Sequence, residues 1–325
     1  MTTGNQQENE VRQWVLDAEA RIREHINETP LEYSLYLSKL TGAEVYLKLD
    51  LMQKTSSFKF RGACSKVMSL TEEEMDKGVL TASTGNYALA VGEAARLRGR
   101  KATIYVGEDI PANRLQIIKD HGFDVVIYGP GAWDAEKRAR QVAEEEDKIY
   151  ISPYNDPVVV GGQGTCGLEI SRQLPDVQAA FFAVGGGGLC GGSGGWLKSF
   201  NPDIKVIGVS PGNSPVMYES VKAGKMLEMQ TFPTLADTCA GGLDLDSVTL
   251  EPVQKYVDEI ILLTEDQIAK AIRILFEQHR LVAEGSGALS VAGFLKMKDS
   301  FKGKKVVLTI CGRNIDLDLF KKIIA

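Results

Sequence analysis

Four consecutive glycines (Gly185, Gly186, Gly187 and Gly188) follow directly on the apolar run of residues 179–184. The run is typical of a buried strand, and glycines at its end leave the backbone N–H groups unobstructed by any Cβ. Such groups can converge on one small anion, and a helix starting beyond them would add its own N–H groups and dipole. The sequence therefore predicts a phosphate site here, with a flexible tight turn as the plainer alternative.

The same glycines also satisfy the pattern G-x-G-x-x-G, which is typical of dinucleotide-binding folds. That pattern calls for an acidic residue at the end of the next strand, where it holds the ribose hydroxyls. The next predicted strand, residues 204–209, is followed by Ser210. A nicotinamide cofactor is therefore the weaker alternative for this loop.

Lys59 lies in the segment T-S-S-F-K-F-R-G-A, at the start of a predicted helix. Ser57 is a natural N-cap, which would put Lys59 in the first turn. The positive end of the helix dipole there lowers the cost of losing the ammonium proton. Because Schiff-base formation needs a neutral amine, Lys59 is a candidate nucleophile. A surface lysine near a cap is the alternative.

Two other segments combine chemistry-bearing residues with predicted element ends. The sequence S-T-G-N, at Ser83, Thr84, Gly85 and Asn86, is a predicted strand-to-helix junction that could bind a carboxylate through backbone N–H groups. Residues 161–165, G-G-Q-G-T, repeat this pattern. An ordinary capping turn explains either segment equally well.

Cys311 closes the last predicted strand, in the segment T-I-C-G-R-N. A weakly polar sulfur at a strand end could face an aromatic nitrogen. A packed core thiol is the commoner case for such a residue.

Strands and helices alternate along most of the chain. We expect strands at residues 44–50, 79–83, 102–106, 125–128, 150–152, 179–184, 204–210 and 305–310, and helices at residues 10–27, 86–97, 111–121, 132–145, 164–173, 188–199, 214–223, 265–278 and 286–297. Such βαβ repetition predicts an α/β fold with parallel-rich twisted sheets covered by helices. Ligands in these folds lie beyond the carboxyl ends of the strands, where the glycine loop is expected.

Composition bounds the function classes. The 325 residues are 44% hydrophobic and 25% charged, as in an ordinary globular protein, and the net charge of −6 argues against a nucleic-acid partner. Five scattered cysteines without a C-x-x-C pair favour free thiols in the cytoplasm. The polar residues 1–10 do not resemble a signal peptide, and the glycine density of residues 179–197 makes a membrane span implausible.

The motifs S-F-K-x-R-G-A, S-T-G-N, G-Q-G-T, G-G-G-G and C-G-x-N occur in this order between residues 29 and 314. In this combination the chain resembles the pyridoxal-phosphate (PLP) enzymes of the serine/threonine dehydratase and serine racemase family. The resemblance implies the fold of tryptophan synthase β-like, fold type II PLP enzymes, and a homodimer. It also implies a large PLP-binding domain, residues 1–52 and 153–325, with a small substrate-binding domain, residues 53–152, inserted in it.

The resemblance also implies roles for individual residues. Lys59 would form the Schiff base with PLP and transfer the Cα proton, and Thr84 stands where serine racemases carry a serine that acts on the opposite face. The residues implied to bind the cofactor are Lys59, Asn86, Gly185, Gly186, Gly187, Gly188, Leu189 and Cys311. The residues implied to bind the substrate are Ser83, Thr84, Gly85, Asn86 and Tyr87.

The implied activity is β-elimination. A 3-hydroxy L-amino acid such as threonine, serine or phenylserine would yield a 2-oxo acid and ammonia. A neutral partner such as Cys311 opposite the pyridine nitrogen should disfavour transamination. The alternatives are an amino-acid racemase and, more remotely, a nicotinamide-dependent oxidoreductase.

The chain departs from the family pattern at several positions. Tyr87 stands where most relatives carry histidine, and Ser210 and Val216 replace the acidic residues of the family's cation site, so we expect no metal. Residues 235–242 resemble the hydroxyectoine-utilisation and phenylserine dehydratase branches. That likeness favours a bulkier substrate, with Tyr87 and Tyr154 as candidates for lining its pocket.

Overall fold

The computed structural model describes residues 3–325, with side chains from Glu10 onward; Met1 and Thr2, part of the polar segment noted above, lie outside it. The strands are β1 (Leu31–Tyr33), β2 (Glu44–Lys48), β3 (Val79–Ala82), β4 (Ala102–Val106), β5 (Asp124–Ile127), β6 (Ile149–Tyr150), β7 (Ala179–Ala183), β8 (Lys205–Pro211), β9 (Glu259–Leu263) and β10 (Lys305–Thr309). The α-helices are α1 (Thr3–Ile22), α2 (Leu35–Thr41), α3 (Lys59–Ser69), α4 (Glu72–Lys77), α5 (Asn86–Leu97), α6 (Ala112–Asp120), α7 (Ala132–Glu145), α8 (Pro157–Gln173), α9 (Gly188–Phe200), α10 (Val216–Ala223), α11 (Leu250–Tyr256), α12 (Glu265–His279), α13 (Gly285–Met297) and α14 (Leu317–Ile324). Short 3-10 turns are η1 (Asp50–Met52), η2 (Lys54–Ser56), η3 (Asp237–Cys239) and η4 (Lys298–Phe301).

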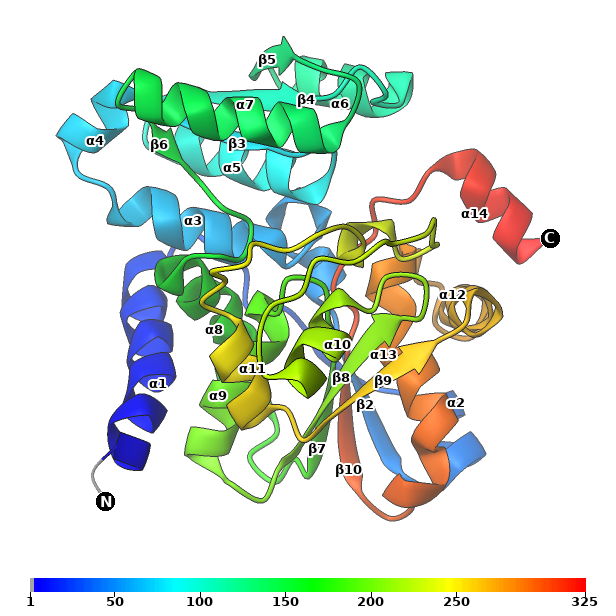
Figure 1. The fold of residues 1–325 in the computed structure, drawn as a ribbon. Helices are drawn as coiled ribbons and strands as arrows, with labels where there is room; N and C mark the ends of the chain where they lie inside the picture. The colour runs from blue at the N-terminus through cyan, green and yellow to red at the C-terminus, as the bar shows by residue number, and fades with distance from the viewer. Residues whose placement is uncertain (1–2) are drawn as a thin grey trace.

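The larger sheet has six strands in the order β1-β2-β10-β7-β8-β9. All neighbours are parallel except β1, which runs antiparallel to β2 at the edge. Helix α13 covers one face, and α8 and α9 lie on the other (Figure 1). The predicted α/β fold with parallel-rich sheets is thereby confirmed.

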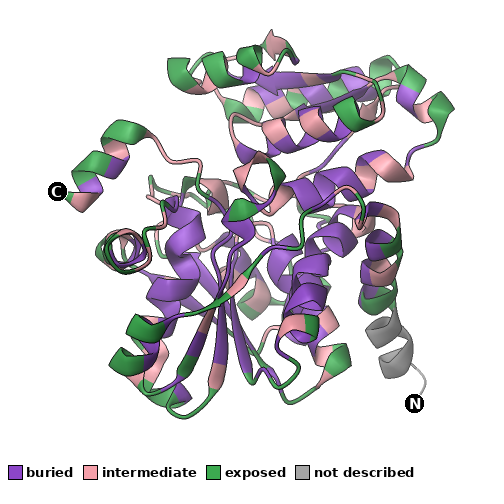
Figure 2. Ribbon diagram, turned by 180° about the vertical axis from the view of Figure 1, so that it is seen from behind, coloured by how far each residue is buried: buried purple, intermediate pink, exposed green. Residues whose placement is uncertain are grey.

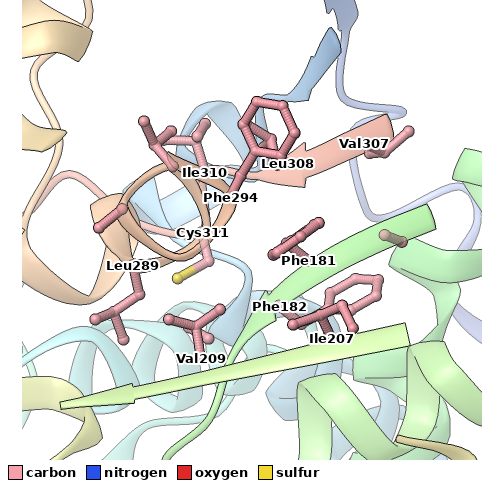
Figure 3. Packing of buried hydrophobic residues seen from close by; sticks show 14 of the residues in the cluster. Phe181, Phe182, Ile207, Val209, Leu289, Phe294, Val307, Leu308, Ile310 and Cys311 are labelled. Carbon is pink, nitrogen blue, oxygen red and sulfur yellow. The ribbon is translucent and has the colours of Figure 1, made fainter. Parts of the chain in front are cut away.

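The core of the larger sheet centres on β7, which pairs with β8 on one side and β10 on the other. β7 is buried along its whole length, and Figure 2 shows the middle strands of this sheet largely buried. Phe181 makes edge-to-face contacts with Phe294 of α13 at 5.7 Å and with Phe301 at 5.2 Å between ring centroids. Cys311, which follows Ile310, belongs to the same buried cluster (Figure 3). The packing thus fixes the strand ends that carry the glycine loop and Cys311.

The smaller sheet, β5-β4-β3-β6, is parallel throughout and comes from residues 79–150. Helices α5 and α7 cover its opposite faces (Figure 1). Helix α3 packs against both α5 and α8, so it lies between the two sheets. The domain boundaries at residues 52/53 and 152/153 stay a prediction.

The glycines of residues 161–165 do not form a strand-to-helix junction. They lie in the middle of α8, which begins at Pro157 behind an Asp156 cap that accepts a hydrogen bond from the Val158 N–H. A Cβ at Gly161 would lie 2.3 Å from the Trp14 carbonyl oxygen, and one at Gly162 would lie 2.5 Å from that of Arg61. The glycines therefore let α8 pack closely against α1 and α3, and the predicted anion-binding turn was wrong.

Boundaries of several other elements match closely, including α5, β4 and α7 at residues 86–97, 102–106 and 132–145. The sequence did not predict α2, α11, β9 or α14. In the described part of the chain, no helix is long and apolar enough to cross a membrane.

Candidate active site

The glycine loop begins where β7 ends and runs into the N-terminus of α9. Gly187 is the N-cap and has φ +82°, a left-handed conformation that favours glycine, and no side chain caps the helix. The Thr249 hydroxyl donates a 2.7 Å hydrogen bond to the Gly186 carbonyl oxygen, which stabilises the loop. Residues 185–189, called the glycine cradle below, therefore present uncapped N–H groups at a helix start, as an anion site requires.

The walls of the glycine cradle leave no room for side chains within it. A Cβ at Gly186 would lie 2.4 Å from the Tyr154 ring, and one at Gly188 would lie 2.2 Å from the Gln163 side-chain oxygen. Lys59 and Cys311 line the same cavity. The structure thus brings together the glycine cradle, Lys59 and Cys311, which lie far apart in the sequence.

Gly187→Ala is expected to weaken cofactor binding about tenfold, because a Cβ would strain the left-handed cap and meet Met217 and Val253 at 3.0 Å. Equilibrium dialysis of the holoenzyme measures this affinity. Gly224→Ala is a matched control, since Gly224 also has a positive φ, +71°, but open space around it. Equal weakening in both variants would contradict a specific role for the cradle.

Lys59 is the first residue of α3, and its amine lies inside the cavity. Nζ donates a 3.3 Å hydrogen bond to the Pro153 carbonyl oxygen and lies 5.6 Å from the Tyr87 ring centroid. Burial lowers the pKa of Lys59, and the charge of Glu284 partly opposes this shift. The environment therefore favours the neutral amine, the form in which lysine is a nucleophile and base.

Ser57 does not cap this helix. Its backbone is extended, Phe58 occupies the N-cap position, and the buried Ser57 hydroxyl has no hydrogen-bond partner. Instead, Ser57 forms an isolated bridge with Gly312, which ties the start of α3 to the segment after β10. Lys59 nevertheless lies in the first turn, as predicted.

Cys311 faces the same cavity from the end of β10. Its Sγ donates a 3.5 Å hydrogen bond to the Ser286 carbonyl oxygen, and burial raises the pKa of the thiol. Cys311 is therefore a neutral group at this wall. The buried Ser286 side chain and the partly buried Cys239 also line the cavity, and the sequence did not single out either one.

The 83–87 segment lies at the start of α5. Gly85 is its N-cap and no side chain caps it, while the Ser83 hydroxyl accepts a 3.3 Å hydrogen bond from the Gly85 N–H. Thr84, Gly85 and Asn86 line a second cavity of about 200 Å³. Thr238 lines both cavities, so the two adjoin at this residue.

The two tyrosines assigned to a substrate pocket differ in position: Tyr154 lines the cavity that holds Lys59 and the glycine cradle, whereas Tyr87 lines neither cavity. Tyr87 is buried, lines neither cavity, and donates a 2.5 Å hydrogen bond from its hydroxyl to the Ser152 carbonyl oxygen. Tyr154 lies against the glycine cradle, and its hydroxyl accepts a hydrogen bond from the Asp244 N–H. The expectation that these tyrosines line a pocket for a bulkier substrate stays a prediction.

Sequence reasoning missed Glu284, a buried acid at the N-cap position of α13. Its Oε1 accepts hydrogen bonds from Asn86 Nδ2 at 2.8 Å and Thr238 Oγ1 at 3.2 Å, and its Oε2 accepts one from the Asn314 N–H at 3.0 Å. Burial raises its pKa to about 7, with a further contribution from the charge of Asp237. The available signal was a lone acid next to G-S-G at the start of an apolar helix.

A buried ion cluster anchors α3 two residues beyond Lys59. Arg61 forms paired hydrogen bonds with Asp50 of η1 and with Glu169 of α8, and Lys48 of β2 contacts Glu169 at 2.6 Å. Burial opposes ionisation of Glu169, but Arg61 and Lys48 outweigh it and lower the Glu169 pKa to about 2. This cluster joins α3, the helix that begins at Lys59, to the larger sheet.

Residues 22–312 match the family model described as "Pyridoxal-phosphate dependent enzyme". The chain is 42% identical over 310 residues to the L-threonine ammonia-lyase of Thermotoga maritima, covering 95% of this chain and 77% of that one. It is 40% identical to the catabolic L-threonine dehydratase of Staphylococcus aureus, covering 93% and 88% of the two chains.

Two solved structures share the fold over nearly the whole length. The processed form of threonine deaminase isoform 2 from Solanum lycopersicum matches with a TM-score of 0.92 and 34% identity, covering 97% of this chain and 92% of that one. Maize serine racemase matches with a TM-score of 0.90 and 30% identity, covering 96% and 95%. These matches do not support the nicotinamide alternative. The chain belongs to the fold type II pyridoxal-phosphate-dependent enzymes, in the threonine dehydratase and serine racemase family.

Proposed function

We propose that this protein is an L-threonine ammonia-lyase that converts L-threonine into 2-oxobutanoate and ammonia. The observation that carries the proposal is the shared cavity, which is lined by the partly buried Lys59, the glycine cradle and Cys311. The names of the relatives at 42% and 40% identity supply the substrate. Tyr87 lines neither cavity and therefore gives no support for a larger substrate.

PLP fits the walls of this cavity. The glycine cradle offers uncapped N–H groups for its phosphate, and Lys59 offers a neutral amine for its aldehyde. Cys311 would face the ring nitrogen as a neutral partner, and Asn86 would hold the ring hydroxyl oxygen. When bound, the cofactor supplies electron withdrawal that acidifies the substrate Cα–H bond.

Lys59 then serves as the base that takes the Cα proton. Its amine is held near the Pro153 carbonyl, which also accepts a 3.0 Å hydrogen bond from Gln163. Burial lowers the pKa of Lys59 and so makes its ammonium proton easier to lose, which suits Nζ to accept the Cα proton and return it later in the cycle. Tyr87 packs beside the amine and helps to exclude water.

The start of α5 is the carboxylate site. Thr84, Gly85 and Asn86 line the second cavity, and the helix start has no capping side chain, so its N–H groups can bind an anion. A Cβ at Gly85 would meet nothing within 4 Å, which leaves open space beside these groups. Holding the carboxylate here would fix the direction of the Cα–H bond relative to Lys59.

The proposal is tested by incubating the purified, PLP-loaded protein with L-threonine, L-serine, 3-hydroxyaspartate and phenylserine. We expect one ammonia and one 2-oxo acid per L-threonine consumed, and the highest kcat/KM with that substrate. A higher kcat/KM with phenylserine than with L-threonine would overturn the assignment of L-threonine as the substrate. Absence of ammonia from every substrate would refute the activity.

Amino-acid racemisation is the second candidate, because the Thr84 hydroxyl lies where serine racemases carry a serine, and maize serine racemase shares the fold. The same incubation distinguishes the two when the inverted enantiomer is measured by chiral chromatography. Predominant inversion without ammonia would favour the racemase.

We also propose that the protein is cytoplasmic, that it forms a homodimer and that it has two domains. Five cysteines without a disulfide support a reducing compartment such as the cytoplasm. Tyr33, Leu35 and Leu40 at the β1–α2 corner are about half exposed, which supports a homodimer contact there. We also retain the division into a domain of residues 53–152 and a larger one formed by the rest.

A further inference from the structure

Glu284 is a buried acid that the proposed steps above do not use. It is 3% exposed and carries three hydrogen bonds, but no cation forms an ion pair with it among the described residues. A Cβ at Gly312 would lie 2.5 Å from Glu284 Oε1, so glycine at that position makes room for the carboxyl. Burying an ionisable carboxyl without a cation partner costs folding free energy, and this cost indicates a functional role for Glu284.

The hydrogen bonds around Asn86 fix the orientation of its amide. The Thr55 carbonyl oxygen accepts a 3.1 Å hydrogen bond from Asn314 Nδ2, since a carbonyl can only accept. Asn314 Nδ2 also donates to Asn86 Oδ1, so Asn86 Nδ2 must face Glu284. One N–H of Asn86 is then engaged by Glu284. Asn86 lines the second cavity, which adjoins the cavity of the glycine cradle at Thr238, so its second N–H is available to the ring hydroxyl oxygen of the cofactor.

We propose that Glu284 is a positioning residue whose ionised carboxylate holds the Asn86 amide as a donor to the cofactor, and that protonation of Glu284 loosens this hold. The inference rests on the proposed cofactor site. Asn86 belongs to α5 beside the smaller sheet, whereas Glu284 and Asn314 come from the larger half, so the contact also joins the two halves.

Protonation acts directly on these contacts. Both carboxylate oxygens already face N–H donors, Asn86 Nδ2 at Oε1 and the Asn314 N–H at Oε2. A proton on either oxygen replaces a charged acceptor by a neutral one, and hydrogen bonds to ionised groups are roughly twice as strong. A proton on Oε1 can be directed to Thr238 Oγ1, which weakens the bond to Asn86.

Burial, with a contribution from nearby charge, places the titration of Glu284 near neutral pH. Burial raises the Glu284 pKa to about 7, and Asp237 of η3 adds to the rise. The other titratable groups that face it are Lys59 of α3, Cys239 of η3 and Cys311 after β10. Arg114 of α6 acts on it through its 2.6 Å ion pair with Asp237.

The test compares cofactor retention by wild-type, Glu284→Gln and Glu284→Asp holoenzymes, measured by equilibrium dialysis from pH 6 to pH 8. The glutamine variant has an N–H₂ group where the carboxylate faced donors, and it cannot titrate. We therefore expect the ratio of PLP dissociation constants, variant over wild type, to rise about tenfold from pH 6 to pH 8, with a midpoint near 7. Glu284→Asp keeps a carboxyl that can titrate. The ratio of PLP dissociation constants for this variant should therefore change less between pH 6 and pH 8 than the ratio for Glu284→Gln.

Asp237→Asn provides a second, independent arm. Removing its charge should shift the midpoint of wild-type retention to lower pH, because Asp237 raises the pKa of Glu284. Asp318→Asn is the control, since this acid is exposed on α14 and should leave the midpoint unchanged.

The outcomes separate this inference from the proposed function. If the wild type binds no PLP, the proposed function fails. If it binds PLP and the Glu284→Gln ratio stays constant with pH, the positioning role is overturned while the function stands. A midpoint that Asp237→Asn does not move would overturn the assignment of the titration to Glu284.

Discussion

Lys59→Ala is expected to lower kcat/KM for L-threonine about 10⁴-fold, the upper range for loss of a positioned proton-transfer group. The reason is local: the variant removes the amine of Lys59, the one lysine among the described residues that line the cavity of the glycine cradle. The purified variant should also lose the Schiff-base absorbance of the cofactor, while the cradle still binds its phosphate. Steady-state kinetics and an absorbance spectrum measure both effects.

A matched lysine is available as the control. Lys54 of η2 lies near Phe60, with its amine 5.8 Å from the ring centroid, and lines neither cavity. Lys54→Ala should therefore keep wild-type kinetics and colour. Added primary amines should restore part of the activity of Lys59→Ala by replacing the missing base. Full activity in Lys59→Ala, or equal loss in both variants, would contradict the assignment of Lys59.

The pH dependence of the wild type should report the same amine. Because burial lowers the pKa of Lys59, its neutral form persists to lower pH than that of an ordinary lysine. Activity is then lost on the acid side as the amine is protonated.

The residues that sequence alone predicted well are those whose role depends on their immediate neighbours. The glycine cradle follows from an apolar strand and a helix start within a few residues, and the first turn of α3 follows from the local motif around Lys59. Even here, the capping role of Ser57 was wrong, because the long-range bridge to Gly312 holds that segment in an extended conformation.

Glu284 and the interior glycines of α8 show what sequence could not predict. Asn86 meets Glu284 across 198 positions of sequence, and no periodicity predicts such a contact. The glycines of residues 161–165 have the composition of a turn, yet their role is to let α8 approach α1 and α3 closely. Tertiary packing decides both cases.

The ion cluster around Arg61 belongs to the same class of long-range features. Lys48 was predicted only as part of a strand, and Glu169 only as part of a helix, yet they are in direct contact. Two cations and two anions, Lys48, Arg61, Asp50 and Glu169, compensate each other without solvent, and the half-buried Arg23 adds a further contact to Glu169. Such clusters are highly sensitive to the loss of one member.

Glu169→Gln should lower the free energy of unfolding by about 3–5 kcal/mol at pH 7, because it leaves the buried charges of Arg61 and Lys48 without their shared anion. The shift in urea midpoint measures this loss. Glu146→Gln is the control: its carboxyl pairs with Lys148 on the surface, so we expect no measurable change.

The effect of Glu169 should also depend on pH in a defined direction. The folded-state pKa of about 2 lies below the ordinary value of 4.5, so the stabilisation is complete above about pH 4.5 and is lost as the pH falls toward 2. The gap in stability between wild type and Glu169→Gln should therefore narrow on acidification below pH 4.5. A gap that stays constant down to pH 3, or a variant as stable as wild type at pH 7, would mean that Glu169 is not the anion that anchors Arg61 and the helix of Lys59.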